Sequence, residues 1–208
     1  DISDSLVAPL TTAQVIESVA AALSGESSAP LGRIAAFVGA KGGCGSSTVC
    51  HNVAWMLAES LNSETVVTDF DLPFGTVGLN FNQDAMRGMG EALSAGERLD
   101  VASIAKLRSK CSDHLSLLTA PCALGEDVDV NVGAALHLTE LLSQSAQFVA
   151  LDMPRVWGNW ARQLIAQADE VVITAEPDLA SLRNTKNMVD AIGTMRGPGW
   201  VPLLVLNR

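Results

Sequence analysis

The sequence predicts a doubly wound α/β fold, in which helices cover both faces of a mostly parallel β-sheet. Two observations support this. Short runs that are apolar on both faces recur along the chain, as in the buried strands of a parallel sheet. Segments with helical periodicity lie between these runs, so strands and helices alternate. Right-handed crossovers would then join the strands into a three-layer αβα domain.

Six of the apolar runs are expected to be strands, and four of the periodic segments are expected to be helices. The strands are predicted at 34–38, 65–68, 115–119, 148–151, 171–174 and 203–206. Ligands of such a sheet bind at the carboxyl ends of the strands. The predicted helices have apolar faces formed by Val49, Val53, Met56, Leu57 and Leu61; by Leu136, Leu141 and Leu142; by Trp160, Leu164, Ile165 and Ala168; and by Leu182, Met188, Val189 and Ile192.

The first thirty residues do not follow this alternation. The stretch "DSLVAPLTTAQVIESVAAAL" predicts a short extended run, a turn at Pro9, and a helix that starts at Thr11 with Gln14 three residues on, the pattern of a capping box. It resembles the last strand and helix of a receiver (CheY-like) domain, although Ala8 stands where a phosphorylatable receiver has lysine. The alternative is a plain N-terminal helix that packs on the main domain.

We therefore expect three parts in the chain. Residues 1–23 would be the C-terminal remnant of a receiver-like domain, residues 24–30 ("SGESSAP") a linker, and residues 31–208 the main domain. The chain begins without methionine and stops directly after an apolar run. We expect it to be a piece of a longer protein, with the main domain truncated at its C-terminus.

Composition limits the classes of function. The net charge is −10, from 13 Lys and Arg against 23 Asp and Glu, and no basic cluster is present, which disfavours general attraction to DNA or anionic lipid. No apolar run reaches the roughly 18 residues of a membrane span. The four cysteines form no CxxC pair, which favours reduced thiols in a cytoplasmic protein.

The most informative stretch is "VGAKGGCGSSTVCHN", residues 38–52, where a glycine-rich loop joins a predicted strand to a predicted helix. Glycines let successive backbone N–H groups turn inward, and the helix N-terminus adds partial positive charge, so this order is typical of a phosphate-binding loop. A hydroxyl at Ser47 would be placed to bind Mg²⁺. The usual pattern GxxxxGK[ST] is broken twice, by Ala40 at the first glycine and by Ser46 at the lysine.

Five separate motifs resemble those of the MinD/ParA family of P-loop ATPases. "AKGGCGSST" is similar to the deviant Walker A motif KGGxGK[ST], in which Lys41 stands at the signature lysine. "VVTDFDLPFGT" resembles the second acidic motif, and "FVALDMP" resembles Walker B. "ITAEPDLASLRNTKNMVDAI" and "VLNR" follow in the family's order, so the resemblance covers residues 31–208.

The resemblance implies ATP and Mg²⁺ as cofactors and a dimer that encloses the nucleotide. Ser47 would bind Mg²⁺, and Asp152 would hold the ion through water. Lys41 would act catalytically by reaching the partner's phosphates, and Asp71 by orienting the attacking water. For Asp71 and Asp152, the alternative is a structural role in capping loops at strand ends. For Asp69, two roles stay open: support of the site residues, or a purely structural role. The implied ATP-binding residues are Lys41, Gly42, Gly43, Cys44, Gly45, Ser46, Ser47, Thr48 and, at the adenine, Asn207.

Ser46 is the departure that matters most for the chemistry. A lysine at this position would bring a unit charge to the β- and γ-phosphates, and loss of one comparable stabiliser of the transition state costs on the order of 10²–10³ in rate. Binding should suffer less, because the backbone amides, the helix dipole and Mg²⁺ remain. Lys41, from the same subunit or from the partner, is a candidate to supply the charge. We expect an ATP-binding switch with slow hydrolysis, and whether ATP is hydrolysed at all stays open.

Within the family, "GAKGGCGSSTVCHNVAW", "DFDLPFGTVGLNFNQD" and "LDMPRVWGNWARQ" resemble the CpaE/TadZ branch of Flp/Tad pilus assembly, whose members carry an N-terminal receiver-like domain. This implies a cytoplasmic scaffold that dimerises with nucleotide and localises pilus and secretion proteins, often at a cell pole beside the inner membrane. Membrane contact would be indirect or through missing segments. Two other functions remain: a partition ATPase that binds DNA, which the acidic charge disfavours, and a metabolic enzyme that uses ATP on a small substrate.

Other polar and aromatic residues have plainer interpretations. His51 and Asn52 follow the loop on a helix, where we expect polar contacts rather than catalysis. Trp157 and Trp160 are expected in the core, with contact to a partner as the alternative. Cys44 would contribute its backbone amide to the loop.

Overall fold

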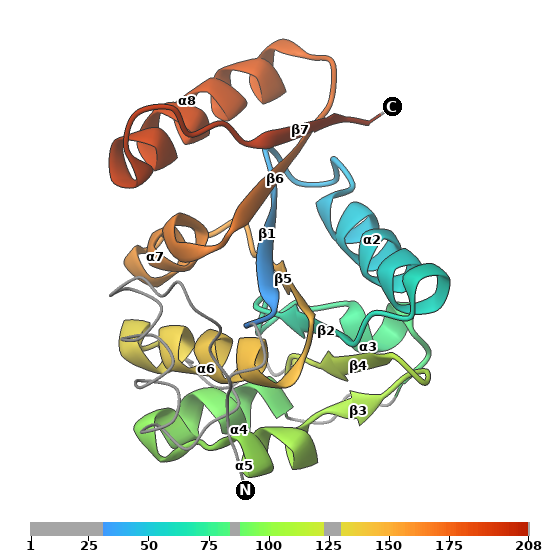
Figure 1. Cartoon of the computed structure of the whole chain (residues 1–208). Coiled ribbons are helices and arrows are strands. Elements are labelled where there is room, and N and C mark those ends of the chain that lie inside the picture. Colours follow the sequence, from blue (N-terminus) through green and yellow to red (C-terminus); the bar gives the residue numbers. More distant parts are fainter. Residues whose placement is uncertain (1–30, 84–87, 123–129, 208) are drawn as a thin grey trace, which may run out of the picture. The chain divides into compact units, whose positions relative to one another are not determined.

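The computed structural model describes residues 31–83, 88–122 and 130–207. The predicted receiver remnant and linker, residues 1–30, lie outside this part of the chain. The described part contains a seven-stranded sheet in the order β3-β4-β2-β5-β1-β6-β7 (Figure 1). β3 runs antiparallel to β4, and the other neighbouring strands are parallel. The doubly wound, mostly parallel sheet that the sequence predicts is confirmed.

All six predicted strands form, and their ends agree with the prediction to within one residue. A short edge strand, β3, was not predicted, because two residues are too few to show a periodicity. The strands are β1 (Arg33–Gly39), β2 (Thr65–Asp69), β3 (Ser109–Lys110), β4 (Leu115–Leu118), β5 (Phe148–Asp152), β6 (Glu170–Ala175) and β7 (Leu203–Leu206).

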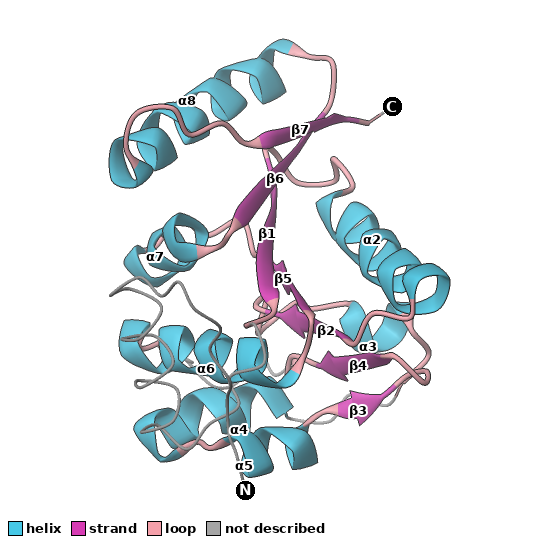
Figure 2. Ribbon diagram, viewed as in Figure 1, coloured by secondary structure: helices cyan, strands magenta, loops and turns pink. Residues whose placement is uncertain are grey.

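Helices cover both faces of this sheet (Figure 2). α2 and α3 lie on one face, and α4 to α8 lie on the other. The side chains of Asp100, Asn131 and Asp178 accept backbone N–H groups at the starts of α5, α6 and α8, which satisfies donors that a helix cannot pair internally. The helices are α2 (Ser46–Leu61), α3 (Val77–Asn80), α4 (Gly88–Ala95), the 3₁₀ turn η1 (Gly96–Arg98), α5 (Val101–Leu107), α6 (Val132–Ser145), α7 (Asn159–Gln167) and α8 (Leu179–Arg196).

The central strand β1 packs against both helical layers. Ala36 and Val38 belong to the core beneath α4 to α8, whereas Ala35 and Phe37 belong to the core beneath α2. Successive side chains of a strand point to opposite faces, so a strand between two layers must be apolar at each position. This requirement explains why the buried strands were visible in the sequence as continuous apolar runs.

The prediction for α2 was wrong about which face is buried. The helix lies against the sheet through small side chains, and Cys50, Ala54 and Ala58 are 0% exposed. Met56 and Leu61, which the prediction placed inward, are 57% and 68% exposed. Small side chains let the helix approach the sheet closely, whereas large ones would hold it away. The other members of the predicted face are Val49 and Leu57, which are partly buried, and Val53, which is exposed.

The inward faces of the remaining predicted helices are largely confirmed. Leu141 and Leu142 of α6 are buried, as are Leu164 and Ile165 of α7. In α8, Ile192 is buried, but the predicted Leu182 is exposed. Leu182 lies in the first turn of α8, where the helix has only just left the carboxyl edge of the sheet.

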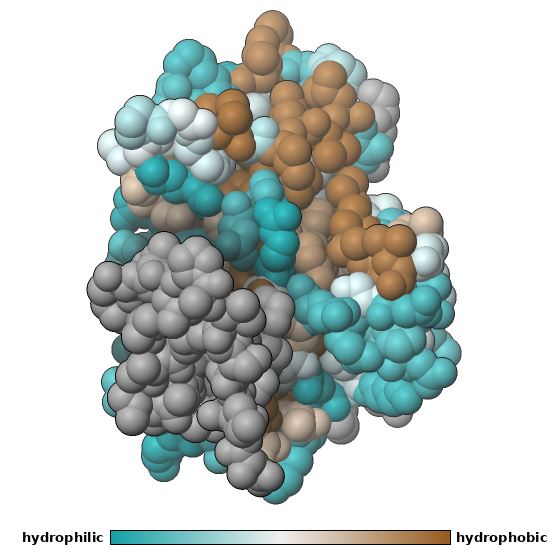
Figure 3. Space-filling model, viewed as in Figure 1, coloured by the Kyte–Doolittle hydropathy of each residue, from teal (hydrophilic) through white to brown (hydrophobic). Residues whose placement is uncertain are grey.

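Apolar side chains are exposed over β7 and over the outward face of α2 (Figure 3). Leu204 and Leu206 of the edge strand β7 are exposed, and so are Trp55 and Met56 of α2. Contiguous apolar surface is typical of sites that contact other protein. Among the described helices, none is both long and apolar enough to cross a membrane.

The packing of α2 predicts that a larger side chain at a buried alanine destabilises the fold. Ala54→Leu overfills a position that is 0% exposed and should lower the free energy of unfolding by about 1–3 kcal/mol. Met56→Gln, on the exposed face of the same helix, should change it by less than about 0.5 kcal/mol. Urea unfolding followed by circular dichroism measures both values, and equal effects would contradict this assignment of the buried face.

Candidate functional site

Three parallel strands end at the same edge of the sheet and bring the predicted motifs together. β5 pairs with β1 on one side and with β2 on the other. In these registers Asp152 lies beside Phe37 of β1 and Asp69 of β2. The loops that follow the three strands therefore begin next to one another, although their motifs are far apart in the sequence.

The loop after β1 turns through two glycines. Gly43 and Gly45 have φ angles of 80° and 93°, in the left-handed region that favours glycine. Gly45 directly precedes α2, so the loop leads into a helix N-terminus. Two contacts anchor the loop: Cys44 Sγ donates to the carbonyl oxygen of Thr174 at 3.2 Å, and Asn207 Nδ2 donates to that of Cys44 at 2.8 Å.

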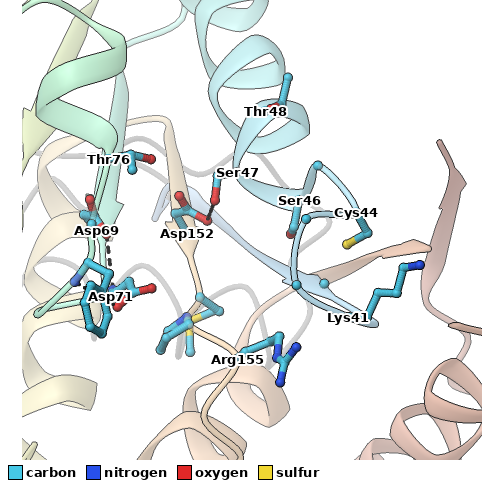
Figure 4. A pocket seen from close by; sticks show the side chains of 18 residues that line it. Lys41, Cys44, Ser46, Ser47, Thr48, Asp69, Asp71, Thr76, Asp152 and Arg155 are labelled. Carbon is cyan, nitrogen blue, oxygen red and sulfur yellow. Dashed lines mark hydrogen bonds between the residues drawn. The ribbon is translucent and has the colours of Figure 1, made fainter. Parts of the chain in front are cut away.

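A hollow of about 370 Å³ opens in front of this loop. Its volume is within the range of small-molecule sites. Figure 4 shows that its side chains come from the loops after β1, β2 and β5. Asn207 is not part of the lining and contacts the loop instead. The predicted site residues that line the hollow are Lys41, Gly42, Gly43, Cys44, Gly45, Ser46, Ser47, Thr48, Asp69, Asp71 and Asp152.

Asp152 is buried and contacts two side chains of α2. Ser47 Oγ donates to its Oδ1 at 3.1 Å, and Nε2 of His51 lies 3.0 Å from its Oδ2. The other ring nitrogen of His51, Nδ1, lies 3.1 Å from Nδ2 of Asn80 in α3. Because an amide nitrogen donates, this geometry fits the tautomer in which Nε2 carries the proton and donates to Asp152. The polar contact expected for His51 is confirmed.

Asp69 holds the loop that carries Asp71. Its carboxylate is 1% exposed and accepts the backbone N–H groups of Asp71 and Val77, at 3.2 and 3.0 Å. Burial raises the pKa of Asp69 to about 7; the N–H of Val77 opposes the rise, and the charge of Asp152 adds to it. A Cβ on Gly75 would collide with this carboxylate, so the loop needs glycine there. Through these contacts Asp69 fixes the loop that places Asp71 at the hollow.

Lys41 lines the hollow, but its ammonium group points elsewhere. Nζ lies 2.7 Å from Oε2 of Glu176 and 2.5 Å from Oδ2 of Asp178, in the segment between β6 and α8. Figure 4 shows the side chain directed away from Asp71 and Asp152. The hydrogen bond to Asp178 and, less strongly, the one to Glu176 raise the pKa of Lys41. The hydrogen bond from Lys41 in turn lowers the pKa of Asp178.

The loop suits an anion such as a phosphate group. Within the described residues, the buried Oγ of Ser46 has no hydrogen-bond partner. Buried polar atoms are normally paired, so an unpaired hydroxyl at a helix N-terminus and a glycine-rich loop fits a ligand that supplies acceptors. No group of three or more His, Cys, Asp or Glu in the described ranges is arranged to hold a metal ion. A magnesium ion would therefore depend on a hydroxyl, water and ligand oxygens, as Mg²⁺ often does.

The two tryptophans after β5 have different environments. Trp160 packs in the core as predicted, with its ring centroid 5.8 Å from that of Phe70. Trp157 is 39% exposed, beside the exposed Val156. The core position expected for Trp157 is therefore wrong, and contact with a partner is the interpretation that stays a prediction.

Sequence reasoning missed three contacts of the site. His51 and Asp152 are 101 residues apart, and Lys41 and Asp178 are 137 residues apart, so no local pattern links them. Arg155 lies against the glycine-rich loop, where a Cβ on Gly42 would be 3.1 Å from its Nη1. For the partners of Lys41, the acidic residues of "AEPD" after a predicted strand were a signal that places carboxylates at this edge.

A family model described as cellulose biosynthesis protein BcsQ matches residues 33–188. The chain belongs to this family of MinD/ParA-type P-loop ATPases. Among its relatives, the septum site-determining protein MinD of Buchnera aphidicola is 25% identical over 162 residues, which are 78% of this chain and 59% of that protein. This MinD/ParA-type chain thus spans less than two thirds of the length of that relative.

Solved structures agree with the fold of this MinD/ParA-type ATPase. The ParA family ATPase from Chlorobium tepidum superposes with a TM-score of 0.73 at 22% identity, covering 85% of this chain and 74% of that one. MinD from Pyrococcus horikoshii, complexed with Mg-ADP, gives a TM-score of 0.66 at 15% identity, covering 86% of this chain and 82% of that one. At these identities the likeness establishes the P-loop fold, and the bound Mg-ADP is a property of the Pyrococcus protein.

The contact between His51 and Asp152 predicts a loss of stability when it is removed. His51→Leu leaves the buried carboxylate without this donor, and the free energy of unfolding should fall by about 1–3 kcal/mol. His51→Gln keeps an amide donor and should lose less. Asn52→Ala removes only a solvent-exposed hydrogen bond to the carbonyl oxygen of Thr48 on the same helix, so it is the matched control and should change stability by less than about 0.5 kcal/mol. Urea unfolding measures all three, and a Leu variant as stable as wild type would refute the predicted importance of this contact.

The buried Asp69 predicts a pH dependence that Asp69→Asn removes. Its pKa is about 7 in the folded protein, against about 3.9 in an unfolded chain. The folded state holds the proton more tightly, so this group lowers stability as pH rises from about 4 to about 7, by up to about 1.4 kcal/mol per pH unit. The Asn variant should therefore gain stability relative to wild type across this interval. Urea unfolding without nucleotide or divalent ions tests this, and a difference that is constant with pH would contradict it.

Proposed function

We propose that this chain binds ATP with Mg²⁺, dimerises in response, and acts as a switch and scaffold in Flp/Tad pilus assembly, with weak or slow hydrolysis. One observation carries the nucleotide part: the glycine-rich loop, the Ser47 hydroxyl and the carboxylates of Asp71 and Asp152 share one cavity, and Ser46 stands at the usual lysine position. The loop supports binding, and the missing charge supports slow turnover. The pilus role is supported by the resemblance to the CpaE/TadZ branch.

The proposal gives each part of the cavity a role. The backbone of residues 42–47 binds the phosphates. Asn207, which lies behind the loop and outside the lining of the hollow, is the residue proposed for contact with the adenine. Ser47 binds Mg²⁺ directly and Asp152 holds it through water; the hydrogen bond of 3.1 Å between these two side chains already sets them side by side. The ion would neutralise charge on the phosphates. Asp71, on the loop held by Asp69, orients the attacking water.

Slow hydrolysis follows from the distribution of charge. Carboxyl groups of Asp71 and Asp152 face the hollow, while the ammonium group of Lys41 is bound to carboxylates outside it. Stabilisation of charge in the transition state depends on cations or dipoles aimed at the reacting group. In a dimer, Lys41 would leave the carboxylates of Glu176 and Asp178 and reach the partner's nucleotide. The state of the protein would then depend on whether ATP is bound, and less on how fast ATP is hydrolysed.

The proposed place of action is the cytoplasm, at the periphery of the inner membrane and often at a pole. An N-terminal receiver-like domain, of which residues 1–23 would be the remnant, fits the domain order of the CpaE/TadZ branch. Exposed apolar side chains such as Trp157 and Val156 lie on the loop after β5, where a partner protein could detect the state of the nucleotide site.

A partition ATPase that binds DNA is the second candidate, because a ParA family ATPase shares the fold. The net charge of −10 opposes it, since DNA binding depends on neutralising phosphates with Lys and Arg. A mobility shift at low salt separates the two functions. Strong retardation of DNA would favour partitioning over the scaffold.

The lack of a positive charge at position 46 should limit the rate of ATP hydrolysis. Wild-type full-length protein is expected to bind Mg·ATP and release phosphate slowly, and Ser46→Lys should raise the rate on the order of 10²-fold. Ser46→Ala, which changes the same position without adding charge, should not show this increase. Binding is measured by titration calorimetry and turnover by phosphate release.

Two results would overturn the proposal. A wild-type protein that binds no Mg·ATP would contradict the proposed switch, and ordinary ATPase turnover by wild type would contradict slow hydrolysis.

Lys41→Ala tests the dimer separately: nucleotide binding by the monomer should persist, whereas ATP-dependent dimerisation, measured by analytical ultracentrifugation, should be lost.

A further inference from the structure

The cavity at the P-loop has a shortage of usable positive charge. Asp71 and Asp152 contribute carboxylates to its lining, and Asp69 contributes a buried carboxyl group. Ser46 replaces the lysine of the usual motif, and the ammonium group of Lys41 is occupied by carboxylates beyond the loop. A polyphosphate that binds here needs a cation from another part of the chain.

Arg155 brings a guanidinium group to this cavity. It comes directly after Met153 and Pro154, and the Met153 N–H donates to the carbonyl oxygen of Phe37 at 3.0 Å, which ties this segment to β1. A Cβ on Gly42 would lie 3.1 Å from Nη1 of Arg155, so the guanidinium lies against the backbone of the loop. Figure 4 shows Arg155 beside the loop.

Among residues 31–83, 88–122 and 130–207, this guanidinium has no other partner. The side chain of Arg155 is exposed, and within the described part of the chain it makes no hydrogen bond or ion pair. Arg196 shows the contrast, because its guanidinium donates to the carbonyl oxygens of Ile165 and Asp169 at 3.3 and 3.2 Å and so joins α8 to α7 and to the turn before β6. Stability of the fold therefore does not explain the position of Arg155.

We propose that Arg155 binds the phosphate groups of the nucleotide and supplies, for binding and not for turnover, the positive charge that Ser46 lacks. Arginine suits this role, since its guanidinium stays charged at all relevant pH and forms paired hydrogen bonds with phosphate oxygens. A phosphate bound at the loop backbone beside Gly42 would meet it directly. The inference rests on the nucleotide binding proposed above and names a binding residue outside the glycine-rich loop.

Removal of the guanidinium should weaken binding of Mg·ATP. In the full-length protein, Arg155→Ala is expected to raise the Kd about 10- to 100-fold, the range for hydrogen bonds to charged groups. Arg155→Lys keeps the positive charge but not the paired N–H donors of the guanidinium, so it should lose less affinity than Arg155→Ala. Arg162→Ala is the matched control, because Arg162 is an exposed arginine of α7 that does not line the cavity. Titration calorimetry measures the affinities, and urea unfolding confirms that the variants are folded.

A double substitution tests whether the two positions supply the same charge. Ser46→Lys should raise the affinity for Mg·ATP by a larger factor in the Arg155→Ala protein than in the wild-type protein. If Ser46→Lys raises the affinity by the same factor in both proteins, Arg155 does not stand in for the lysine. If the Arg155→Ala protein binds Mg·ATP like wild type, Arg155 has no binding role. Failure of wild type to bind Mg·ATP is a different result, because it refutes the proposed function itself.

Discussion

The pairing of β5 with both β1 and β2 is the constraint on which the site depends. Parallel strands in register end at one edge, so Asp152 is fixed between the loop after β1 and the loop after β2. A slip of one residue would turn every side chain of β5 to the opposite face and carry Asp152 away from Ser47 and His51. The apolar fit of the strand and the geometry of the site are therefore set by the same register.

The second constraint is the contact of α2 with the sheet. Cys50, Ala54 and Ala58 form the buried side of this helix, and side chains of this size allow close approach. His51 is then buried at the first turns and reaches Asp152, while Ser47 reaches the other oxygen of the same carboxylate. Packing far from the loop thus decides where the helix N-terminus lies, and with it the position at which a phosphate would bind.

Most of the fold and the members of the site were predictable from the sequence, for physical reasons. Buried parallel strands must be apolar on both faces, and a loop that needs φ angles near 80° and 93° must carry glycine, as at Gly43 and Gly45. The face of α2 was not predictable from apolar periodicity, because the side that meets the sheet is selected for small size and the large apolar residues point outward. The short elements α3 to α5 and β3 lack enough residues to show a period. Contacts between charged or polar groups, such as His51 with Asp152, depend on a register that is known only once the strands are paired.

Lys41 and Arg155 differ in what must happen before each can bind an anion. Lys41 must leave Glu176 and Asp178, and the bond that caps α8, from the Ser181 N–H to Asp178, can persist when it does. The side chains of Lys41 and Asp178 are only partly buried, and water weakens such ion pairs, so this departure is not strongly opposed. Arg155 has no partner in the described residues to give up. Under the proposed function, a single subunit would use Arg155 to hold a nucleotide, and Lys41 would stay available for contact across a dimer. The absence of lysine at position 46 would then separate nucleotide binding from the later step that joins two subunits, because each step would draw on a different cation.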